Sequence, residues 1–274
     1  MRIIFGVLSV ILLAACASHN NQVAIKPGEF PGPTVGQGSY NEAIGQMALE
    51  KEIGIHGYVV RAHYTLVAPG GIIGQHSHKN RPMIGYFLEG EATETKKDLD
   101  GKILVRTIKA DESELEPNGI THWWLNQSSE TNGILGIDIF QDPNPDSCNC
   151  KSAPRTTSFL PPTNSDTGRV EDMGQFDLGQ QFPDNSEFKG YIMRGRRQTL
   201  LPHQRTKLEN NIGKIGMTYL VKGEALQNSS DAEPSIRRTG AVFYAHKGIS
   251  YYWENSGSQA VVLFVVEILP KTDQ

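Results

Sequence analysis

The chain has 274 residues, and 26 Lys and Arg residues against 30 Asp and Glu residues give a formal net charge of −4. This length suits one large or two ordinary domains, and 38% hydrophobic with 20% charged residues excludes an intrinsically disordered chain. The near-neutral charge argues against a nucleic-acid-binding surface, so no nucleic-acid partner is expected. With 28 Gly and 15 Pro residues, the composition favours many short strands joined by turns.

The N-terminal residues have the pattern of an export signal. Arg2 precedes an apolar run, residues 3–15, and a positive start before a short apolar segment is typical of a secretory signal peptide. The run ends in Leu-Ala-Ala-Cys16, which resembles the lipobox of bacterial lipoproteins. The resemblance implies that the signal peptide, residues 1–15, is removed and that Cys16 is acylated, as by palmitate. We therefore expect a lipid anchor to a membrane of the bacterial cell envelope, and Ala17 implies the outer membrane, facing the periplasm.

The next residues connect this anchor to the folded protein. Residues 16–42 are polar and rich in Pro and Gly, so they are expected to be a flexible tether. Residues 42–52 are the candidate for an amphipathic helix. The first folded domain is expected over residues 43–142.

Three of the eight histidines are spaced as metal ligands within this first domain. His76 and His78 are two residues apart, which places both imidazoles on one face of a strand. His122 follows a Pro-Asn-Gly turn, at the start of another expected strand. Two imidazoles from one strand and a third from a facing strand form a facial set of three nitrogen ligands. Such a set suits one divalent transition metal, namely Fe, Zn, Mn, Ni or Cu.

The spacing around these histidines resembles the two sequence motifs of the cupin superfamily. The matching positions are Gly70, His76, His78 and Gly90 for the first motif, and Asp111, Pro117, Gly119, His122 and Asn126 for the second. The resemblance implies an all-β jelly-roll barrel that binds a divalent metal through His76, His78 and His122. Iron is the first choice, because cupin dioxygenases with three histidine ligands form a known group.

Two positions depart from the cupin pattern. The usual glutamate ligand falls on Met83, and the first glycine of the second motif is Asp111. Because a thioether is a poor ligand for hard divalent ions, Met83 is expected to be a wall residue. Glu91, Glu94 and Glu116 lie near expected turns and are expected to be solvated. The predicted site therefore contains three neutral imidazoles and no carboxylate.

Strand alternation predicts which other side chains share the pocket with the histidines. The expected pocket-lining residues are Arg81, Met83, Gly85, Phe87, Trp124 and Asn126. Gly85 would leave room for a ligand, and Phe87 with Trp124 would form an apolar wall. Arg81, beside a proline at the barrel mouth, is either a guide for a substrate carboxylate or a solvated loop arginine.

A segment rich in Pro, Ser, Thr, Asn and Asp follows the first domain. Residues 143–183 are expected to be a linker or a strap between two domains. They contain Cys148 and Cys150, the cysteines that remain once Cys16 is acylated. Disulfides form in exported proteins, so a loop disulfide between them is expected, although a spacing of two residues strains it. A copper or redox site is the alternative.

The rest of the chain repeats the first domain. Residues 58–92 align without a gap with residues 191–225, and seven of the 35 positions are identical where roughly two would be by chance. Residues 119–126 align in the same way with residues 248–255. This internal duplication predicts two tandem cupin barrels in an all-β chain, and the second barrel is expected over residues 184–274.

The second copy keeps the frame of the motifs but not the ligands. Glu209, Asn211 and Tyr251 stand where the first copy has its three histidines. One carboxylate and one amide are too few ligands, so the second barrel is expected to hold no transition metal. A structural role is expected for it, through covering the first barrel or through formation of a homodimer. A repurposed pocket for a sugar or a small acid is the alternative.

Three functions remain open at this point. The first is a mononuclear non-haem metal enzyme, dioxygenase-like, that acts on a small organic molecule in the periplasm. The second is an isomerase or lyase with the same metal but without redox chemistry, which normally needs a general base in the pocket. The third is a lipid-anchored protein that binds a small molecule or a sugar without turnover, because a fold does not fix a function.

Overall fold

The computed structural model describes residues 30–144, 159 and 166–271. The chain divides into two compact units, Met1–Pro31 and Gly32–Gln274, and the second unit contains both halves of the internal duplication. Several expected features fall on residues that are not described, and they stay predictions. These are the signal peptide (1–15), the acylated Cys16, and the pair Cys148 and Cys150.

The first half of the described chain is almost entirely β-structure, as the composition predicts. Its elements are β1 (Gln37–Ala48), α1 (Leu49–Ile53), β2 (Tyr58–Ser77), β3 (Met83–Glu89), β4 (Glu91–Lys97), β5 (Ile103–Lys109), β6 (Ser113–Glu116), β7 (Thr121–Leu125) and β8 (Asn132–Gln141). The sheet order is β5-β4-β7-β2-β8-β3-β6, with β1 also paired to β2. β2 pairs with β8 along its first part and with β7 along its last part, with a register shift near its end. This change of partner curves the sheet into a barrel.

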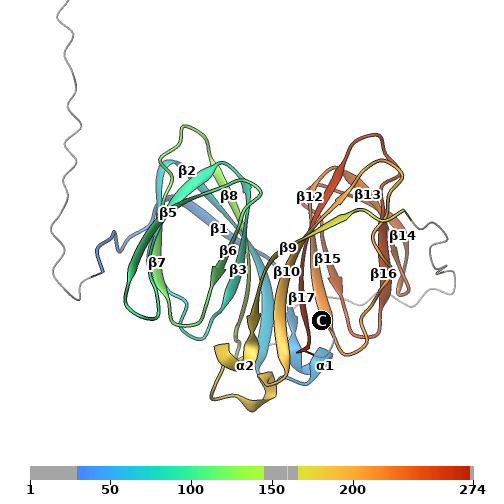
Figure 1. Ribbon diagram of the computed structural model, residues 1–274, viewed down its shortest axis with the longest axis horizontal. Helices are drawn as coiled ribbons and strands as arrows, with labels where there is room; N and C mark the ends of the chain where they lie inside the picture. Colours follow the sequence, from blue (N-terminus) through green and yellow to red (C-terminus); the bar gives the residue numbers. More distant parts are fainter. Residues whose placement is uncertain (1–29, 145–158, 160–165, 272–274) are drawn as a thin grey trace, which may run out of the picture. The chain divides into compact units, whose positions relative to one another are not determined.

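The second half has the same architecture (Figure 1). Its elements are β9 (Arg169–Asp177), α2 (Leu178–Gln181), a 3₁₀ turn (Ser186–Phe188), β10 (Tyr191–Leu200), β11 (Glu209–Asn210), β12 (Ile215–Lys222), β13 (Glu224–Ser229), β14 (Ala232–Arg238), β15 (Val242–Ala245), β16 (Ser250–Glu254) and β17 (Val261–Pro270). One sheet has the order β15-β12-β17-β10-β9 and the other the order β11-β16-β13-β14. The expectation of an all-β chain with two barrels is confirmed.

β1 is a strand where the sequence suggested a helix. The expected helix over residues 42–52 is wrong for most of its length, because β1 continues to Ala48 and only Leu49–Ile53 are helical. β1 pairs with β2 throughout, and these backbone hydrogen bonds outweigh the helix propensity of its residues. Residues 37–43 are all exposed, so they lack the alternation that identifies a half-buried strand. β1 therefore begins inside the segment expected to be a tether.

β9 and α2 lie inside the segment expected to be a linker, and they repeat β1 and α1. Residues 42–47 (Glu-Ala-Ile-Gly-Gln-Met) and residues 171–176 (Glu-Asp-Met-Gly-Gln-Phe) share three identities at an offset of 129. β9 pairs with β10 as β1 pairs with β2. The duplicated unit therefore starts earlier than the repeat found by the longest alignment.

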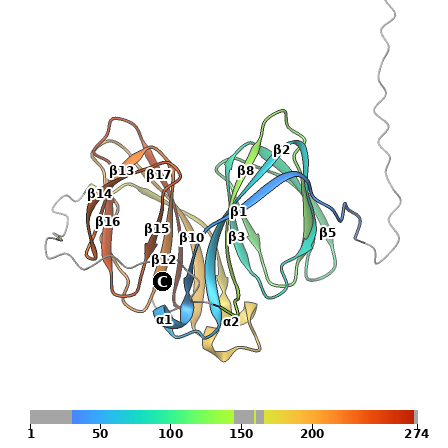
Figure 2. The same cartoon turned by 180° about the vertical axis from the view of Figure 1, so that it is seen from behind.

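The two barrels share one hydrophobic core. The ring of Tyr86 in the first barrel stacks on Phe264 in the second, with centroids 4.6 Å apart. The Tyr244 hydroxyl donates to the carbonyl of Ile44 in β1 at 3.4 Å, so β1 reaches the second barrel. Figure 2 shows β1 and β10 between the two barrels from the other side. The second barrel thus covers one face of the first.

A glycine stands at each crossing between the barrels. A Cβ on Gly45 would overlap the hydroxyl of Tyr244, and one on Gly174 would lie 2.9 Å from the Leu115 side chain. Gly45→Ala is therefore expected to lower the free energy of unfolding by about 1–3 kcal/mol, because Tyr244 must move out of a packed interface. Chemical denaturation measures the change. The control is Gly257→Ala in an exposed loop, and equal midpoints for the two variants would contradict the prediction.

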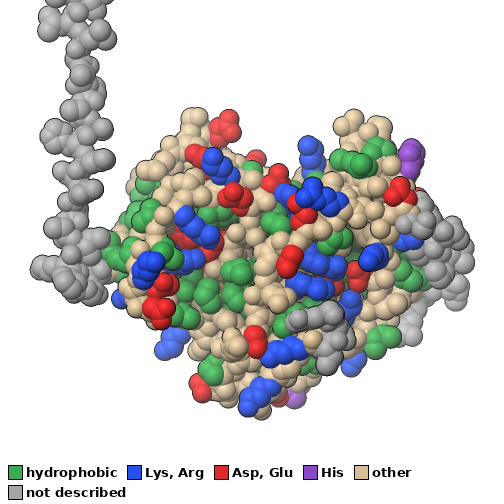
Figure 3. Space-filling model, in the orientation of Figure 1, with side chains coloured by type: hydrophobic (Ala, Val, Ile, Leu, Met, Phe, Trp, Pro, Cys, Tyr) green, Lys and Arg blue, Asp and Glu red, His purple; other side chains and the backbone are tan. Residues whose placement is uncertain are grey.

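The described surface carries both signs of charge. Figure 3 shows Lys and Arg side chains interspersed with Asp and Glu over both barrels, in keeping with the small net charge. Within the described ranges, the structure contains no helix that is long and apolar enough to cross a membrane.

Candidate metal centre

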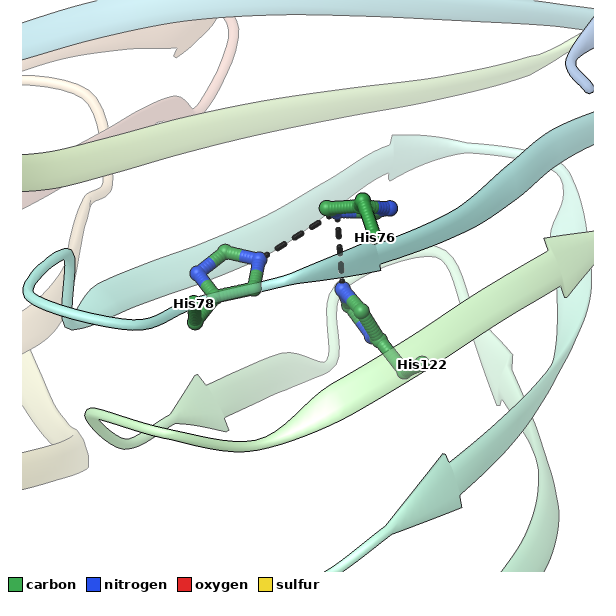
Figure 4. A group of neighbouring side chains, drawn as sticks. All are labelled: His76, His78 and His122. Carbon is green, nitrogen blue, oxygen red and sulfur yellow. Dashed lines mark hydrogen bonds between the residues drawn. The ribbon is translucent and has the colours of Figure 1, made fainter. Parts of the chain in front are cut away.

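Three histidines converge in the first barrel (Figure 4). His76 lies near the end of β2, His78 follows directly after this strand, and His122 lies in β7. The Nε2 atom of His76 is 3.3 Å from Nε2 of His78 and 3.0 Å from Nε2 of His122. Two nitrogens bound to one ion at about 2.1 Å, with angles of about 90–109°, would be roughly 3.0–3.4 Å apart. The fold therefore brings the expected ligands together at the spacing of a metal site.

The outer nitrogen of each ring has a partner, and the inner nitrogens face one another. Nδ1 of His76 and Nδ1 of His78 each lie 3.0 Å from a backbone carbonyl oxygen. Because these oxygens accept, the two Nδ1 atoms carry the proton, and each of the two Nε2 atoms presents a lone pair to the same point. Nδ1 of His122 has two partners, Oε1 of Glu94 at 2.7 Å and the indole N–H of Trp124, which donates to it at 2.9 Å. A divalent cation at this point would take one Nε2 lone pair from each ring. The residues present fit a metal ion.

Strand register and one contact from the second half hold the ligands in place. β2 pairs with β7 so that His76 is directly opposite His122. The turn before β7 is held by α2, because Oε1 of Gln181 accepts a hydrogen bond from the backbone N–H of Asn118 at 2.7 Å. Oδ1 of Asn118 in turn accepts from the N–H of Asn80 at 2.7 Å, in the turn that follows His78. The second half therefore supports both turns that flank the ligands.

The histidines line a cavity of about 490 Å³ in the first barrel. Of the residues expected to line it, Arg81, Met83 and Trp124 do so, and Gly85, Phe87 and Asn126 do not. Phe87 is fully buried behind Trp124, and their stacked rings are 4.9 Å apart. Asn126 is buried and donates to the carbonyl of Val67 at 2.9 Å, so it supports a turn. Strand alternation predicts which side chains point inward. It does not distinguish the side chains that line the cavity from those packed in the core behind it.

Two arginines share one buried carboxylate at the cavity wall. Asp138 is 0% exposed and lies 2.7 Å from Nη2 of Arg61 and 3.4 Å from Nη1 of Arg81. Two positive charges and one negative charge leave a surplus positive charge beside the cavity. Of these three residues, the sequence pattern indicates Arg81 alone. The signal was available, because Arg61 is one of the identities between the two repeats.

A fourth histidine, His63, also lines the cavity beside these charges. Burial lowers its pKa against the opposing effect of Asp138, and the two nearby arginines lower it further. His63 is therefore neutral at pH 7. Its Nδ1 is buried and has no hydrogen-bond partner among the described residues. The sequence pattern does not indicate His63, because it lies far along β2 from the two spaced histidines.

Glu94 and Glu116 are buried, so the expectation that they are solvated is wrong. Both are 0% exposed and lie on strands, β4 and β6, with their side chains directed inward. Glu94 accepts the hydrogen bond from His122, and its other oxygen lies 3.2 Å from Nε of Arg106. Glu116 lines the cavity, and its Oε2 is 2.8 Å from Nε2 of His78. A carboxylate therefore lines the cavity beside the three imidazoles, where the sequence predicted none.

The protonation states favour cation binding at this centre. Burial, together with the neighbouring His122, lowers the pKa of His76 to about 4, so this ring is neutral at pH 7. Burial would raise the pKa of the Glu116 carboxyl, but the imidazoles of His122 and His78 beside it hold that pKa well below its ordinary value. Glu116 is therefore ionised, and it needs either protonated imidazoles or a metal cation nearby.

The second barrel holds protein cations beside Glu209, the residue that stands where the first copy has His76, and beside Glu267, the equivalent of Asp138. Glu267 is 1% exposed and lies 3.0 Å from Nη2 of Arg194 and 2.8 Å from Nη2 of Arg196. Nζ of Lys214 lies 2.9 Å from Oε2 of Glu209. Among the described residues, the groups of side chains spaced for a metal ion are in the first barrel. The expectation that the second barrel holds no metal stays a prediction, and its charges support it.

Comparison with known proteins connects this geometry to a fold class. No family model matches the sequence. Solved structures of oxalate decarboxylase from Bacillus subtilis resemble the chain with a TM-score of 0.57. They include a tryptophan-to-tyrosine variant and a structure described for its Mn(II) centres, each with 15% sequence identity over 88% of this chain and 74% of theirs. The chain therefore has the two-barrel jelly-roll fold of the bicupins.

A sequence relative points the same way. Over 92 residues the chain is 28% identical to a germin-like protein from Morus alba, which covers 34% of this chain and 43% of that protein. The match therefore spans less than half the length of this curated relative. Together, the relative and the structural neighbours support the cupin superfamily, as the two motifs indicated.

Proposed function

We propose that this protein is a metal-dependent enzyme that holds one divalent ion at His76, His78 and His122 and acts on a small organic acid. The observation that carries the proposal is the convergence of three imidazole Nε2 atoms inside a cavity of about 490 Å³. A cavity of this size suits a small molecule. When bound, the ion would supply Lewis acidity or a binding place for dioxygen, depending on its identity.

The residues around the centre have separate roles in this proposal. Arg81 and Arg61 bind the carboxylate of the substrate, because their shared partner Asp138 neutralises only one of their two charges. Trp124 forms an apolar wall beside the ligands and excludes water from that side. His63, a neutral imidazole that lines the cavity, exchanges a proton with the substrate. The active site therefore combines a metal face, an anion-binding face and a proton-exchanging group.

The reaction class has two candidates. The first is oxidation by dioxygen with iron, because a facial set of protein ligands leaves positions for a substrate and for oxygen. The second is a lyase or isomerase reaction without redox chemistry. His63 favours it, since it supplies an acid–base group that the sequence did not reveal. Manganese is the second choice of metal, because one oxalate decarboxylase neighbour is described for its Mn(II) centres.

We further propose that the enzyme is lipid-anchored at Cys16 in the bacterial cell envelope, in the outer membrane facing the periplasm. The support is the pattern of residues 1–17. We also propose that the main partner of the protein is a small-molecule substrate. Formation of a homodimer is a further proposal.

Elemental analysis and an oxygen electrode test the proposal. The purified chain should contain about one divalent ion and be stabilised against heat by a small mono- or dicarboxylic acid. Oxygen uptake that requires the acid supports the oxygenase, and conversion of the acid without oxygen uptake supports the lyase or isomerase. A chain that binds neither iron, manganese nor zinc, even after exposure to each, would contradict the proposal.

Arg81→Gln tests the anion-binding face. We expect an increase of about 10- to 100-fold in KM or Kd for the acid, since a hydrogen bond to a charged group contributes about 1.5–3 kcal/mol. The metal content should not change, because the side chain of Arg81 is not a ligand. Lys79→Gln is the matched control, since it removes an exposed positive charge from the same turn. Equal effects of the two variants would indicate that the acid is attracted by the positive charge of the surface in general, and not bound by Arg81 in the cavity.

A further inference from the structure

We propose that Glu116 is a fourth metal ligand, which supplies from β6 the carboxylate that the cupin pattern places at position 83 on β3. This inference rests on the metal centre of the proposed function. The motif position holds Met83, whose thioether is a poor ligand for a hard ion. β3 and β6 are paired so that Met83 is directly opposite Glu116. Directly opposite residues of paired strands point to the same face, so both side chains face the cavity.

The carboxylate is close enough to join the histidines. Oε2 of Glu116 lies 2.8 Å from Nε2 of His78, and Oε1 lies 3.6 Å from Nδ1 of His122. The shorter distance is about that expected between two atoms that bind one ion at roughly 2.1 Å. The carboxylate therefore reaches the centre beside Nε2 of His78, while its other oxygen lies near the outer nitrogen of His122.

Charge and hydrogen bonding single out Glu116 among the buried carboxylates of this barrel. Glu94 and Glu114 are accompanied by Lys96 and Arg106, as Asp138 is by its two arginines. Within the described residues, no Lys or Arg pairs with Glu116, and neither of its oxygens receives a well-aligned hydrogen bond. A fully buried carboxylate without such partners is costly. A divalent ion at the three imidazoles removes that cost.

The second barrel provides an internal comparison. The position equivalent to Glu116 is Ala245, which lies directly opposite Gly216, the equivalent of Met83. The copy that lacks the three histidines therefore also lacks the carboxylate. If Glu116 served only to stabilise the barrel, its loss would not need to accompany the loss of the histidines.

Ligation by Glu116 would change the net charge of the metal centre and the number of coordination positions that stay open to a substrate. Three neutral imidazoles and one carboxylate leave a divalent ion with a net charge of about +1 and, for a six-coordinate metal, about two open positions. A bidentate organic acid would fill both positions. A monodentate acid would leave one position for dioxygen or water. Glu116 thereby limits which substrates bind together with a second small molecule.

Metal titration of variants tests this inference, with Mn(II) and Zn(II) as the probes. Glu116→Gln keeps the shape of the side chain and removes its charge, so we expect the affinity for both ions to fall by about 100-fold. The double variant Met83→Glu/Glu116→Met moves the carboxylate to the paired strand, and we expect it to recover most of the affinity. Glu112→Gln, an exposed glutamate just before β6, is the control and should bind as the wild type does.

The outcomes separate this inference from the proposed function. If the wild type binds neither ion, the metal centre itself is wrong. If the wild type binds but Glu116→Gln binds equally well, only the role of Glu116 is overturned. A loss in Glu116→Gln without recovery in a folded double variant also contradicts ligation. Should the double variant not fold by circular dichroism, Glu116→Ala with added sodium formate replaces it. Formate should then restore Mn(II) binding, and its failure to do so overturns the inference.

Discussion

Replacing His122 by Ala is expected to reduce the metal content of the purified chain from about one ion to less than about one tenth of an ion. The imidazole of His122 is one of three whose Nε2 atoms meet at one point, and its ring is fully buried. Alanine leaves no donor atom there, and the hydrogen bond that orients the ring on Glu94 is lost with it. Elemental analysis after dialysis measures the effect, and any activity on a small acid should disappear in parallel.

The matched control is His203→Asn in the second barrel. His203 is exposed and has a positive φ of 66°, a conformation that Asn tolerates well. Metal content should therefore not change. The wild-type stoichiometry is itself informative, because we expect one ion per chain and not two. Full occupancy in His122→Ala, or two ions per wild-type chain, would contradict the assignment of the centre to the first barrel.

The metal ligands could be predicted from the sequence because their positions follow from local geometry. His76 and His78 share a strand face through their spacing alone, and the turn before His122 marks the start of the partner strand. The remaining step, that β2 and β7 pair with His76 opposite His122, came from the resemblance to the cupin motifs. The structure has this register.

Glu116 could not be predicted because its role depends on the pairing of two strands far apart in the sequence. It stands one residue before a Pro-Asn-Gly turn, where glutamates are usually solvated. Only the register of β3 with β6 places it opposite Met83 and inside the barrel. The same holds for Asp138, which the register of β2 with β8 places opposite Arg61. Strand alternation predicts the face of the sheet on which a residue lies, but it does not predict which residue of the paired strand lies opposite.

β1 and β9 were missed for a different reason. Both are edge strands with largely exposed residues, so neither has the apolar alternation that identifies a strand. The short repeat at an offset of 129, with a glycine at each crossing between the barrels, is the signal that identifies them. The structure explains the two glycines of this repeat, because a side chain of the other barrel fills the space beside each of them.

Replacing Glu267 by Gln is expected to lower the free energy of unfolding by about 3–5 kcal/mol, the usual effect of breaking a buried ion pair on one side. Glu267 is 1% exposed and contacts Arg194, Arg196 and Lys214 at 3.0, 2.8 and 3.5 Å. Without its charge, Arg194 loses its carboxylate partner, and Arg196 and Lys214 keep only the carboxylate of Glu209. Burial of these uncompensated charges, and not a change in packing, is the physical reason for the loss. Chemical denaturation monitored by tryptophan fluorescence measures it.

Glu224→Gln is the control, because Glu224 pairs with Arg238 on the surface at 2.7 Å and both side chains are largely exposed. Its effect should stay within about 1 kcal/mol. Glu267 and Arg194 stand where the first barrel has Asp138 and Arg61, so both barrels contain this buried ion pair. In the second barrel, Arg196 and Lys214 also contact Glu209, which stands in the place of His76. If Glu267→Gln were as stable as Glu224→Gln, these charges would not hold the second barrel together, and its stability would have to come from the core that it shares with the first.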